Sequence, residues 1–197
     1  MYEGLDEFFR TAHERAVDWA RGLLKLDPSE WVILDTETTG LGERDEIVQV
    51  AMIDGAGKVL FDNVLVKPTI HIPNDAAAIH RISNEMVANA LSFSMIAPDF
   101  IEAAKGKIVV IYNADYDLRL IRQSLNAHGY GPDWDNVKSF DCAMLQYAAW
   151  VGDWNDYYKS FRWQKLPAGD HSALGGCRAV LELIHKMAES KTDKTGE

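Results

Sequence analysis

The decapeptide WVILDTETTG, residues 31–40, decides the fold of this chain. Its apolar half predicts a buried strand, because the run is short, contains β-branched residues and leads into a polar turn that ends in a glycine. Residues two apart on a strand point to the same face, so Asp35 and Glu37 would project side by side. Two carboxylates this close repel each other, and a hard cation such as Mg²⁺ or Mn²⁺ would stabilise them. The alternative is a strand that ends in a polar turn with both acids solvated.

The composition is typical of one globular domain. The chain has 197 residues, of which 47% are hydrophobic and 25% are charged, so it is long enough to bury a substantial core. No apolar run approaches the roughly 18 residues of a membrane span, and the acidic N-terminus lacks a signal-peptide pattern. The two cysteines, Cys142 and Cys177, predict reduced thiols rather than a disulfide framework. We therefore expect a cytoplasmic protein without a membrane partner.

The net charge of −10 restricts the ways in which the chain could bind nucleic acid. Broad electrostatic binding needs basic patches, and this composition argues against them. A nuclease is still compatible with the charge, because divalent cations reverse the sign of a site that is lined by carboxylates.

The hydrophobic periodicity predicts alternating strands and helices with short connections. Five strands are expected, of which the first three form an antiparallel meander: 31–36, 46–53, 58–66, 107–112 and 137–141. Amphipathic spacing and capping residues predict a short turn at 74–79 and helices at 4–26, 83–90, 93–105, 116–128, 142–151 and 172–188. The aromatic segment 152–170 is expected to be irregular and to pack on the core, with a substrate groove as the alternative.

Polar clusters lie at the ends of three of these predicted elements. Asp35 and Glu37 end the first strand, Asp117 follows the strand at 107–112, and His171 precedes the last helix. In α/β sheets, sites form where loops converge at the carboxyl ends of strands. Several carboxylates without thiolates favour two-metal phosphoryl transfer, and a histidine that titrates near pH 7 suits proton abstraction. The alternative for His171 alone is a surface histidine near a helix N-terminus.

In these motifs the chain resembles the DnaQ-like 3′–5′ exonucleases that use a catalytic histidine, the DEDDh group, which includes proofreading subunits and ribonuclease T. The first motif is DTETTGL at 35–41, the second is NADYD at 113–117, and the third opens at His171. The pattern of the second motif makes Asp117, rather than Asp115, the expected site acid.

The resemblance covers residues 30–188 and implies an RNase H-like α/β fold. Its sheet would be mixed and five-stranded, with three antiparallel strands followed by parallel ones and with helices on both faces. We accordingly expect an N-terminal helical extension at 1–28 that packs on the core, an exonuclease domain at 29–190 and a mobile tail at 191–197.

The resemblance also implies a reaction, the removal of mononucleotides from single-stranded 3′ ends of DNA or RNA. Asp35 would bridge two Mg²⁺ or Mn²⁺ ions, Glu37 would bind the ion that carries the attacking water, and Asp117 would support the second ion. His171 would act as the general base on that water. Two cations about 3.5–4 Å apart can activate the water and stabilise the leaving oxygen.

The substrate is expected to be a single-stranded 3′ end whose bases stack on aromatic and apolar side chains. The segment IHRIS at 79–83 resembles the family's Ile-His-Gly-Ile-Thr segment, which lies near that end. The candidates for base stacking are Leu41, His80 and Phe93, and core packing is the alternative for each of them. A homodimer and a polymerase-type partner are the two alternatives for protein association. The expected substrate-binding residues are Thr38, Thr39, Gly40, Leu41, His80 and Asn113.

The third motif departs from the family's pattern at one position. A fourth carboxylate is expected after His171 and four further residues, and this chain has Gly176 there. Neither metal binding nor helix propensity explains this residue, because a glycine inside a helix costs about 1 kcal/mol relative to alanine. Three explanations are open. Gly175 packs closely on the sheet and Gly176 is incidental, or the chain is an engineered variant that lacks one metal ligand, or the chain has lost its activity naturally. We expect impaired exonuclease activity, and a non-catalytic module that binds nucleic acid or protein is the second hypothesis.

Overall fold

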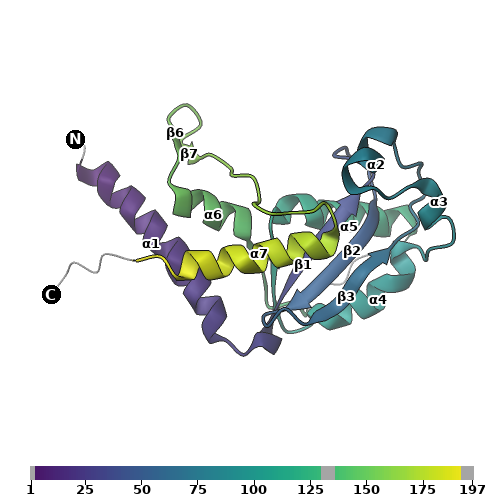
Figure 1. The fold of residues 1–197 in the computed structure, drawn as a ribbon, viewed down its shortest axis with the longest axis horizontal. Helices are drawn as coiled ribbons and strands as arrows, with labels where there is room; N and C mark the ends of the chain where they lie inside the picture. The colour runs from purple at the N-terminus through teal and green to yellow at the C-terminus, as the bar shows by residue number, and fades with distance from the viewer. Residues whose placement is uncertain (1–2, 130–135, 192–197) are drawn as a thin grey trace.

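The computed structural model describes residues 3–129 and 136–191, and its centre is a mixed sheet (Figure 1). Five strands form this sheet: β1 (Trp31–Thr38), β2 (Ile47–Asp54), β3 (Val59–Leu65), β4 (Ile108–Ile111) and β5 (Ser139–Cys142). Their spatial order is β3-β2-β1-β4-β5. The first three strands pair antiparallel, whereas β4 pairs parallel with both β1 and β5. The decapeptide at 31–40 therefore contains the central strand.

Helices cover both faces of the sheet (Figure 1). They are α1 (Glu3–Lys25), α2 (Asn74–His80), α3 (Asn84–Val87), α4 (Phe93–Ala104), α5 (Ala114–Ala127), α6 (Ala143–Val151) and α7 (Ala173–Ala188). Helices α4 and α5 pack on one face, and α1, α6 and α7 pack on the other. The mixed five-stranded α/β architecture expected from the sequence is thus confirmed.

The alternation of side chains along β1 explains why the sheet needs helices on both sides. Val32 and Leu34 are fully buried in the core beneath α4 and α5. Trp31 and Ile33 are equally buried in the core beneath α1 and α7. A strand that is apolar on both faces can only sit inside a three-layer structure, because burial of apolar surface dominates the folding free energy.

The short helices α2 and α3 cover the end of the sheet where β1 stops. Ala76, Ile82 and Val87 from this region pack against Val48 of β2. This packing places His80, the last residue of α2, beside the polar turn that follows β1. The helices therefore bring the predicted IHRIS segment to the same sheet end as the predicted acids.

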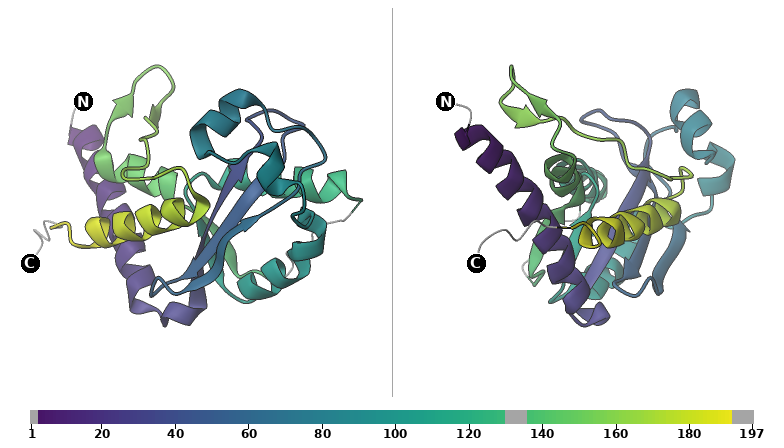
Figure 2. Two further views of the ribbon diagram at one scale, coloured as in Figure 1. Left: turned by 45° about the vertical axis from the view of Figure 1, so that its right-hand side comes forward. Right: turned by 60° about the vertical axis from the view of Figure 1, so that its left-hand side comes forward.

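Helix α1 crosses α6 and α7 on the outer side of the molecule (Figure 2). Trp19 donates from Nε1 to Oδ2 of Asp141 at 2.7 Å, and Arg21 donates from Nε to the carbonyl of Ala188 at 2.9 Å. The division into a helical extension and a separate domain stays a prediction. In the described part of the chain, no helix combines the length and apolarity that crossing a membrane requires.

Several predicted boundaries differ from those observed, and the helix predicted at 83–90 is only the short α3, which ends at Val87. Helix α5 begins at Ala114 rather than Tyr116, because the Asn113 carbonyl accepts hydrogen bonds from the Tyr116 and Asp117 amides and so starts the helix two residues earlier. The segment predicted to be irregular contains a hairpin of β6 (Trp154–Asn155) and β7 (Ser160–Phe161), so that prediction is wrong there. Residues 130–135, between the helix predicted at 116–128 and the strand predicted at 137–141, and nearly all of the predicted tail, 192–197, lie outside the described residues.

Candidate active site

The carboxyl end of β1 and the entry to α7 enclose a cavity of about 260 Å³. Asp35 and Glu37 project into it from one face of the strand, as their spacing requires. His171 and Gly176 line the opposite wall, together with part of the strap at 165–169. The cavity therefore joins the first and third sequence motifs.

Asp117 lies beside this cavity rather than on its wall. It is buried in the first turn of α5, where its Oδ1 accepts a hydrogen bond from the Thr36 hydroxyl at 2.6 Å. Thr36 sits between the two cavity acids in sequence and points to the other face of β1. The structure thus brings Asp35, Glu37 and His171 to one cavity and holds Asp117 immediately behind them.

Burial raises the pKa values of all three carboxyl groups, and the charges of neighbouring carboxylates add to this for Asp35 and Glu37. Burial is the largest cause for Asp35, and the charges of Asp117 and Glu37 add to it, so its pKa lies well above the usual range. Burial and the charges of Asp117 and Asp170 raise the pKa of Glu37 to about 7. Burial likewise raises the pKa of Asp117 to about 7, against the opposing hydrogen bond from Thr36. An acid cluster with this much mutual repulsion calls for positive charge from outside the cluster.

The N-terminus of α7 is fixed by side chains from three directions. Ser172 caps the helix, since its hydroxyl accepts from the Gly175 amide at 3.0 Å. Gln49 on β2 accepts from the Ala173 amide at 3.0 Å, and Asn63 on β3 accepts from the Leu174 amide at 2.8 Å. Helix amides without an internal partner need such acceptors. The helix is therefore held in register against the sheet next to the acids.

His171 is exposed and occupies the left-handed region with a φ of 60°. Asp170 holds the turn around it, because its Oδ1 accepts from both the amide and the hydroxyl of Ser172, at 3.0 and 2.7 Å. A non-glycine residue rarely adopts this conformation unless its surroundings impose it. The turn places the exposed His171 on the wall of the same cavity that Asp35 and Glu37 line.

Both glycines of the third motif are explained by close approach. A Cβ on Gly176 would overlap the Asp35 carboxylate, 2.6 Å from its Cγ, and a Cβ on Gly175 would overlap Asp170, 2.6 Å from its Cγ. Gly175 therefore lies against a loop carboxylate rather than against the sheet, and Gly176 lies against the carboxylate of Asp35. The carboxylate of Asp35 occupies the space that a side chain at position 176 would take.

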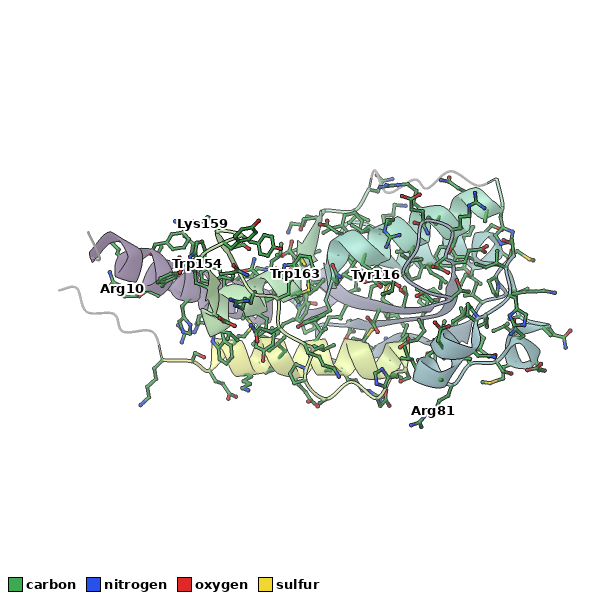
Figure 3. All side chains as sticks on the ribbon, turned by 90° about the horizontal axis from the view of Figure 1, so that it is seen from above. Arg10, Arg81, Tyr116, Trp154, Lys159 and Trp163 are labelled. Atoms are coloured by element: carbon green, nitrogen blue, oxygen red, sulfur yellow. The ribbon has the colours of Figure 1, made fainter. Side chains whose placement is uncertain are left out.

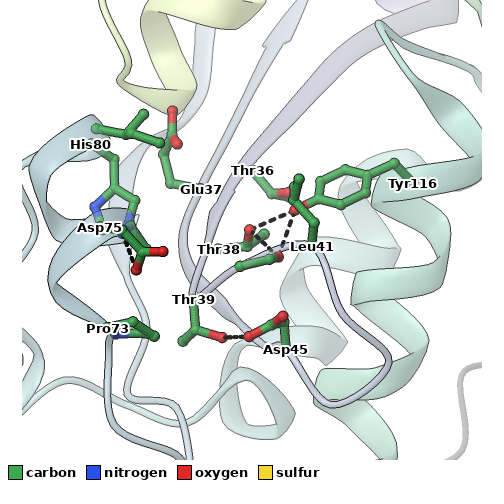
Figure 4. A pocket seen from close by; sticks show the side chains of 13 residues that line it. Thr36, Glu37, Thr38, Thr39, Leu41, Asp45, Pro73, Asp75, His80 and Tyr116 are labelled. Atoms are coloured by element: carbon green, nitrogen blue, oxygen red, sulfur yellow. Dashed lines mark hydrogen bonds between the residues drawn. The ribbon is translucent and has the colours of Figure 1, made fainter.

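A second, larger cavity of about 590 Å³ adjoins the first and shares Glu37 with it (Figure 4). It is lined by five of the six predicted substrate-binding residues and by residues of α2 and α5. Leu41 is 80% exposed, which excludes core packing for it, whereas Phe93 is 1% exposed and belongs to the core. Asn113 does not line the cavity and instead precedes α5. The predicted residues on its wall are Thr38, Thr39, Gly40, Leu41 and His80.

His80 is buried on the wall of this second cavity. Its Nδ1 accepts from the Ile82 amide at 3.1 Å, so Nε2 carries the proton of the neutral ring. Burial lowers the pKa of the imidazole, which favours this neutral form. His80 can therefore act as a hydrogen-bond donor at the cavity, and its Nε2 has no other partner among the described residues.

Helix α5 clamps the loop that carries Leu41. Tyr116 donates to the Gly40 carbonyl at 2.9 Å, and Arg119 donates from Nη1 to the Gly42 carbonyl at 2.8 Å. Gln123 donates from Nε2 to the Asp45 carbonyl at 2.7 Å. These three residues share one face of the helix, since they are three and four positions apart.

The sequence reasoning missed both the α5 clamp and the acceptors that fix α7. The spacing of Tyr116, Arg119 and Gln123 is a usable signal for a common helix face, but it does not say which loop that face contacts. Gln49 and Asn63 give a weaker signal, as polar residues inside predicted strands. Their partners lie more than a hundred positions away, at Ala173 and Leu174.

The donor set suits a divalent cation in its chemistry. Asp35, Glu37 and Asp117 offer the carboxylate oxygens that Mg²⁺ and Mn²⁺ prefer, and a cation would relieve their repulsion. As the side chains stand, no three His, Cys, Asp or Glu residues within 3–129 and 136–191 converge on one ion position. Asp117 is turned to Thr36 and Asp35 is turned to Gly176. Binding therefore requires these side chains to rotate, and position 176 contributes no ligand.

A mixed sheet of this strand order, with acids at the end of its central strand and a histidine before its last helix, defines an exonuclease of the RNase H-like class. Residues 32–184 match the exonuclease family (RNase_T). The chain belongs to this family and is a hydrolase that acts on nucleic acids. The resemblance drawn from the motifs is thus confirmed.

Relatives in sequence include a phage protein that matches this chain over most of both lengths. The exonuclease CP81 of Escherichia phage 186 is 37% identical in an alignment 198 positions long, which covers 91% of this chain and 95% of that protein. DNA polymerase III subunit epsilon of Rickettsia felis is 36% identical over 100 residues, which cover 48% of this chain and 44% of that protein. The chain therefore spans nearly all of the phage protein and less than half of the polymerase subunit.

Solved structures share the fold. Exonuclease X, solved in complex with 5′ overhanging duplex DNA, superposes with a TM-score of 0.54 at 26% identity over 83% of this chain and 96% of that one. E. coli exonuclease I, solved in complex with an oligonucleotide, superposes with a TM-score of 0.63 at 17% identity over 83% of this chain and 41% of that one. The second likeness bears on the fold alone.

Proposed function

We propose that this chain is a metal-dependent 3′–5′ exonuclease that removes mononucleotides from single-stranded 3′ ends. The observation that carries the proposal is the meeting of Asp35, Glu37 and His171 at one cavity, with Asp117 directly behind it. The adjoining cavity of about 590 Å³ is large enough for a nucleotide and contains neutral His80 and exposed Leu41 on its wall. The 3′–5′ direction and the single-stranded 3′ end follow from the resemblance of the motifs at 35–41, 113–117 and 171 to the DnaQ-like exonucleases. The DNA polymerase III epsilon relatives support a nucleic-acid substrate.

Each site residue has a proposed role. Asp35 and Glu37 would hold Mg²⁺ or Mn²⁺, and the Asp117 carboxylate, which now accepts from Thr36, would support a second ion. Bound divalent cations supply charge stabilisation and a more acidic water. His171 accepts the proton of the attacking water, and its exposed position lets the imidazole pass that proton to solvent. His80 and the Thr38–Leu41 turn hold the terminal nucleotide.

We further propose that Gly176 impairs this activity. The residue contributes no ligand, and Asp35 turns into the space that it leaves. Metal ions would then bind with one carboxylate fewer, so that turnover is slow while the fold is intact.

A hydrolysis assay with labelled strands tests the function. Single-stranded DNA and RNA of equal length, labelled at the 5′ end, are incubated with Mg²⁺, Mn²⁺ or EDTA, and the products are resolved on a gel. We expect metal-dependent shortening from the 3′ end, absent in EDTA and absent in His171→Ala. Hydrolysis that persists in EDTA, or that His171→Ala leaves unchanged, contradicts the proposal.

Gly176 also favours a second candidate, a non-catalytic module that binds nucleic acid or protein on the same fold. The same assay separates the two, because binding without any metal-dependent turnover supports the module. For protein partners, the polymerase III relatives support a polymerase-type assembly, and a homodimer is the alternative.

A further inference from the structure

The aromatic segment between α6 and α7 divides into a packed half and an exposed half. Trp154 and Phe161 form a cross-strand pair with ring centroids 5.2 Å apart, and both pack against Phe8 and Phe9 of α1. The remaining rings face solvent, with exposed fractions of 85% for Tyr157, 72% for Tyr158 and 70% for Trp163. Large apolar rings at this exposure are unusual on a monomer and need a reason.

The exposed rings stand on a rigid support. The packed half anchors the hairpin to α1, and the Tyr112 hydroxyl donates to the Gln164 carbonyl at 2.6 Å just beyond Trp163. Tyr158, Phe161, Arg162 and Trp163 surround a hollow of about 500 Å³, which is within the range of small-ligand sites. Two of the exposed rings, Tyr158 and Trp163, therefore border a space large enough for a nucleobase, and Tyr157 lies next to Tyr158 with ring centroids 4.8 Å apart.

The charge of this segment differs from that of the chain as a whole. Between 153 and 165 there are three basic residues and two acidic ones, whereas the whole chain has a net charge of −10. Lys159 and Arg162 pair with Asp156 and Asp153 at 3.6 and 3.3 Å. These pairs are solvent-exposed, so they exchange partners at little cost and can turn to a phosphate.

The segment also leads directly into the candidate active site. Lys165 and Leu166 follow Trp163 in sequence and line the cavity of Asp35, Glu37 and His171. Seen from above, Trp163 lies between Trp154 and Tyr116 along the long axis of the molecule (Figure 3). A chain of alternating rings and positive charges thus runs from the hairpin to the cavity.

We propose that Tyr157, Tyr158 and Trp163 form a stacking path for the part of a single-stranded nucleic acid that lies 5′ of its bound terminus. Successive bases stack on the rings, while Lys159, Arg162 and Lys165 contact phosphates. A single-stranded nucleic acid would contact both the aromatic and the basic residues, whereas a purely apolar protein surface would contact the rings alone. The proposal rests on the proposed function, because it assigns a route to the same substrate.

Binding measured apart from turnover tests the path. Fluorescence anisotropy gives the affinity for a 5′-labelled dT12 and for a dT2, with Ca²⁺ as the only divalent cation and the strands checked for integrity afterwards. We expect Trp163→Ala and Tyr158→Ala each to weaken dT12 binding about fivefold or more, with dT2 binding unchanged. Trp163→Phe should restore dT12 binding to within twofold, because it keeps a stacking ring.

A matched control is Met95→Ala on α4, which removes another exposed apolar side chain from the opposite face of the sheet. It should leave dT12 binding unchanged. If the Trp163→Ala, Tyr158→Ala double variant binds dT12 as tightly as the unmodified chain, or if the unmodified chain binds dT12 no better than dT2, the path is wrong. Loss of self-association in that variant, with dT12 binding intact, would instead assign these rings to a protein contact.

The outcome is separable from that of the proposed function. Absence of metal-dependent hydrolysis, with ring-dependent dT12 binding, would leave the path in place and remove the nuclease. Metal-dependent hydrolysis, together with dT12 binding that the ring substitutions leave unchanged, would support the nuclease and rule out the stacking path.

Discussion

A Cβ atom on Gly176 would lie 2.6 Å from Cγ of Asp35, so the helix that completes the site has its backbone against the central acid. The overlap involves the far end of a flexible side chain, and a larger residue at position 176 can displace it by rotation about χ1. A substitution there should therefore redirect Asp35 without disrupting the fold.

Gly176→Asp should restore a full set of four carboxylates. We expect the affinity for Mn²⁺, measured by titration calorimetry, and the exonuclease rate each to rise on the order of 100-fold, because charge stabilisation by metal ions contributes several kcal/mol to such reactions. Gly176→Ala is the control, since it displaces Asp35 equally but adds no ligand. Equal gains in both variants would mean that the position of Asp35, not the missing acid, limits the reaction.

The stability of the metal-free chain should depend on the acid cluster. The folded pKa values of Glu37 and Asp117 are about 7, above their ordinary values of 4.5 and 3.8, so the folded state holds more protons between these limits. Stability should then rise as the pH falls from 8 to 5, by at least about 1 kcal/mol. Urea unfolding in EDTA at several pH values measures the slope.

Asp117→Asn should flatten this slope, because it removes one titrating group and its repulsion of Asp35. Asp115→Asn, at an exposed position of the same helical turn, is the matched control and should leave the slope as it is. An equal dependence of stability on pH in the unmodified chain, Asp117→Asn and Asp115→Asn would show that Asp117 does not titrate with a raised pKa in the folded state.

The α5 clamp should control the mobility of the Leu41 loop. Arg119→Met removes donors to the carbonyls of Leu41 and Gly42 and keeps most of the side-chain volume. We expect faster amide exchange in residues 40–45, because each lost hydrogen bond lowers the stability of the closed loop by about 0.5–1.5 kcal/mol. We also expect a higher KM with little change in kcat. Arg122→Met, at an exposed position of the same helix, should change none of these. Unchanged exchange in the Arg119 variant would contradict the clamp.

Two glycine substitutions should have opposite effects on stability. A Cβ on Gly55 would overlap the buried indole of Trp31, 2.8 Å from its Cζ2, so Gly55→Ala should destabilise the fold by about 1–3 kcal/mol. Gly22 on α1 is exposed and has open space around it, so Gly22→Ala should stabilise by about 0.5–1 kcal/mol. Thermal or urea unfolding checks both, and a loss of stability in each would refute the packing argument.

Most of the fold could be predicted because its signals are local. The apolar run before Asp35, the turn at Asp54–Gly57 and the capping Ser83 each mark an element within a few residues of its observed boundary. Helix α5 was harder to delimit, because Asn113 starts it through a backbone carbonyl rather than through a side-chain cap that the sequence would reveal.

The candidate site could be predicted as a set of residues but not as a geometry. The spacing of Asp35 and Glu37 fixes their common face, whereas the contact of Gly176 with Asp35 depends on how closely α7 approaches β1. The split of the aromatic segment is of the same kind. Trp154 is covered because Phe8 and Phe9 of α1 pack against it. No local sequence pattern predicts this contact between segments far apart in the chain.

The hydrogen bond between the Ala173 amide and Gln49 spans 124 positions of the chain. Parallel pairing of β1 with β4 and docking of α7 both require closure of long loops, and such contacts form late in folding. During synthesis, Asp35 and Glu37 are therefore exposed long before His171 emerges from the ribosome. A nascent chain therefore lacks one wall of the candidate site until α7 docks.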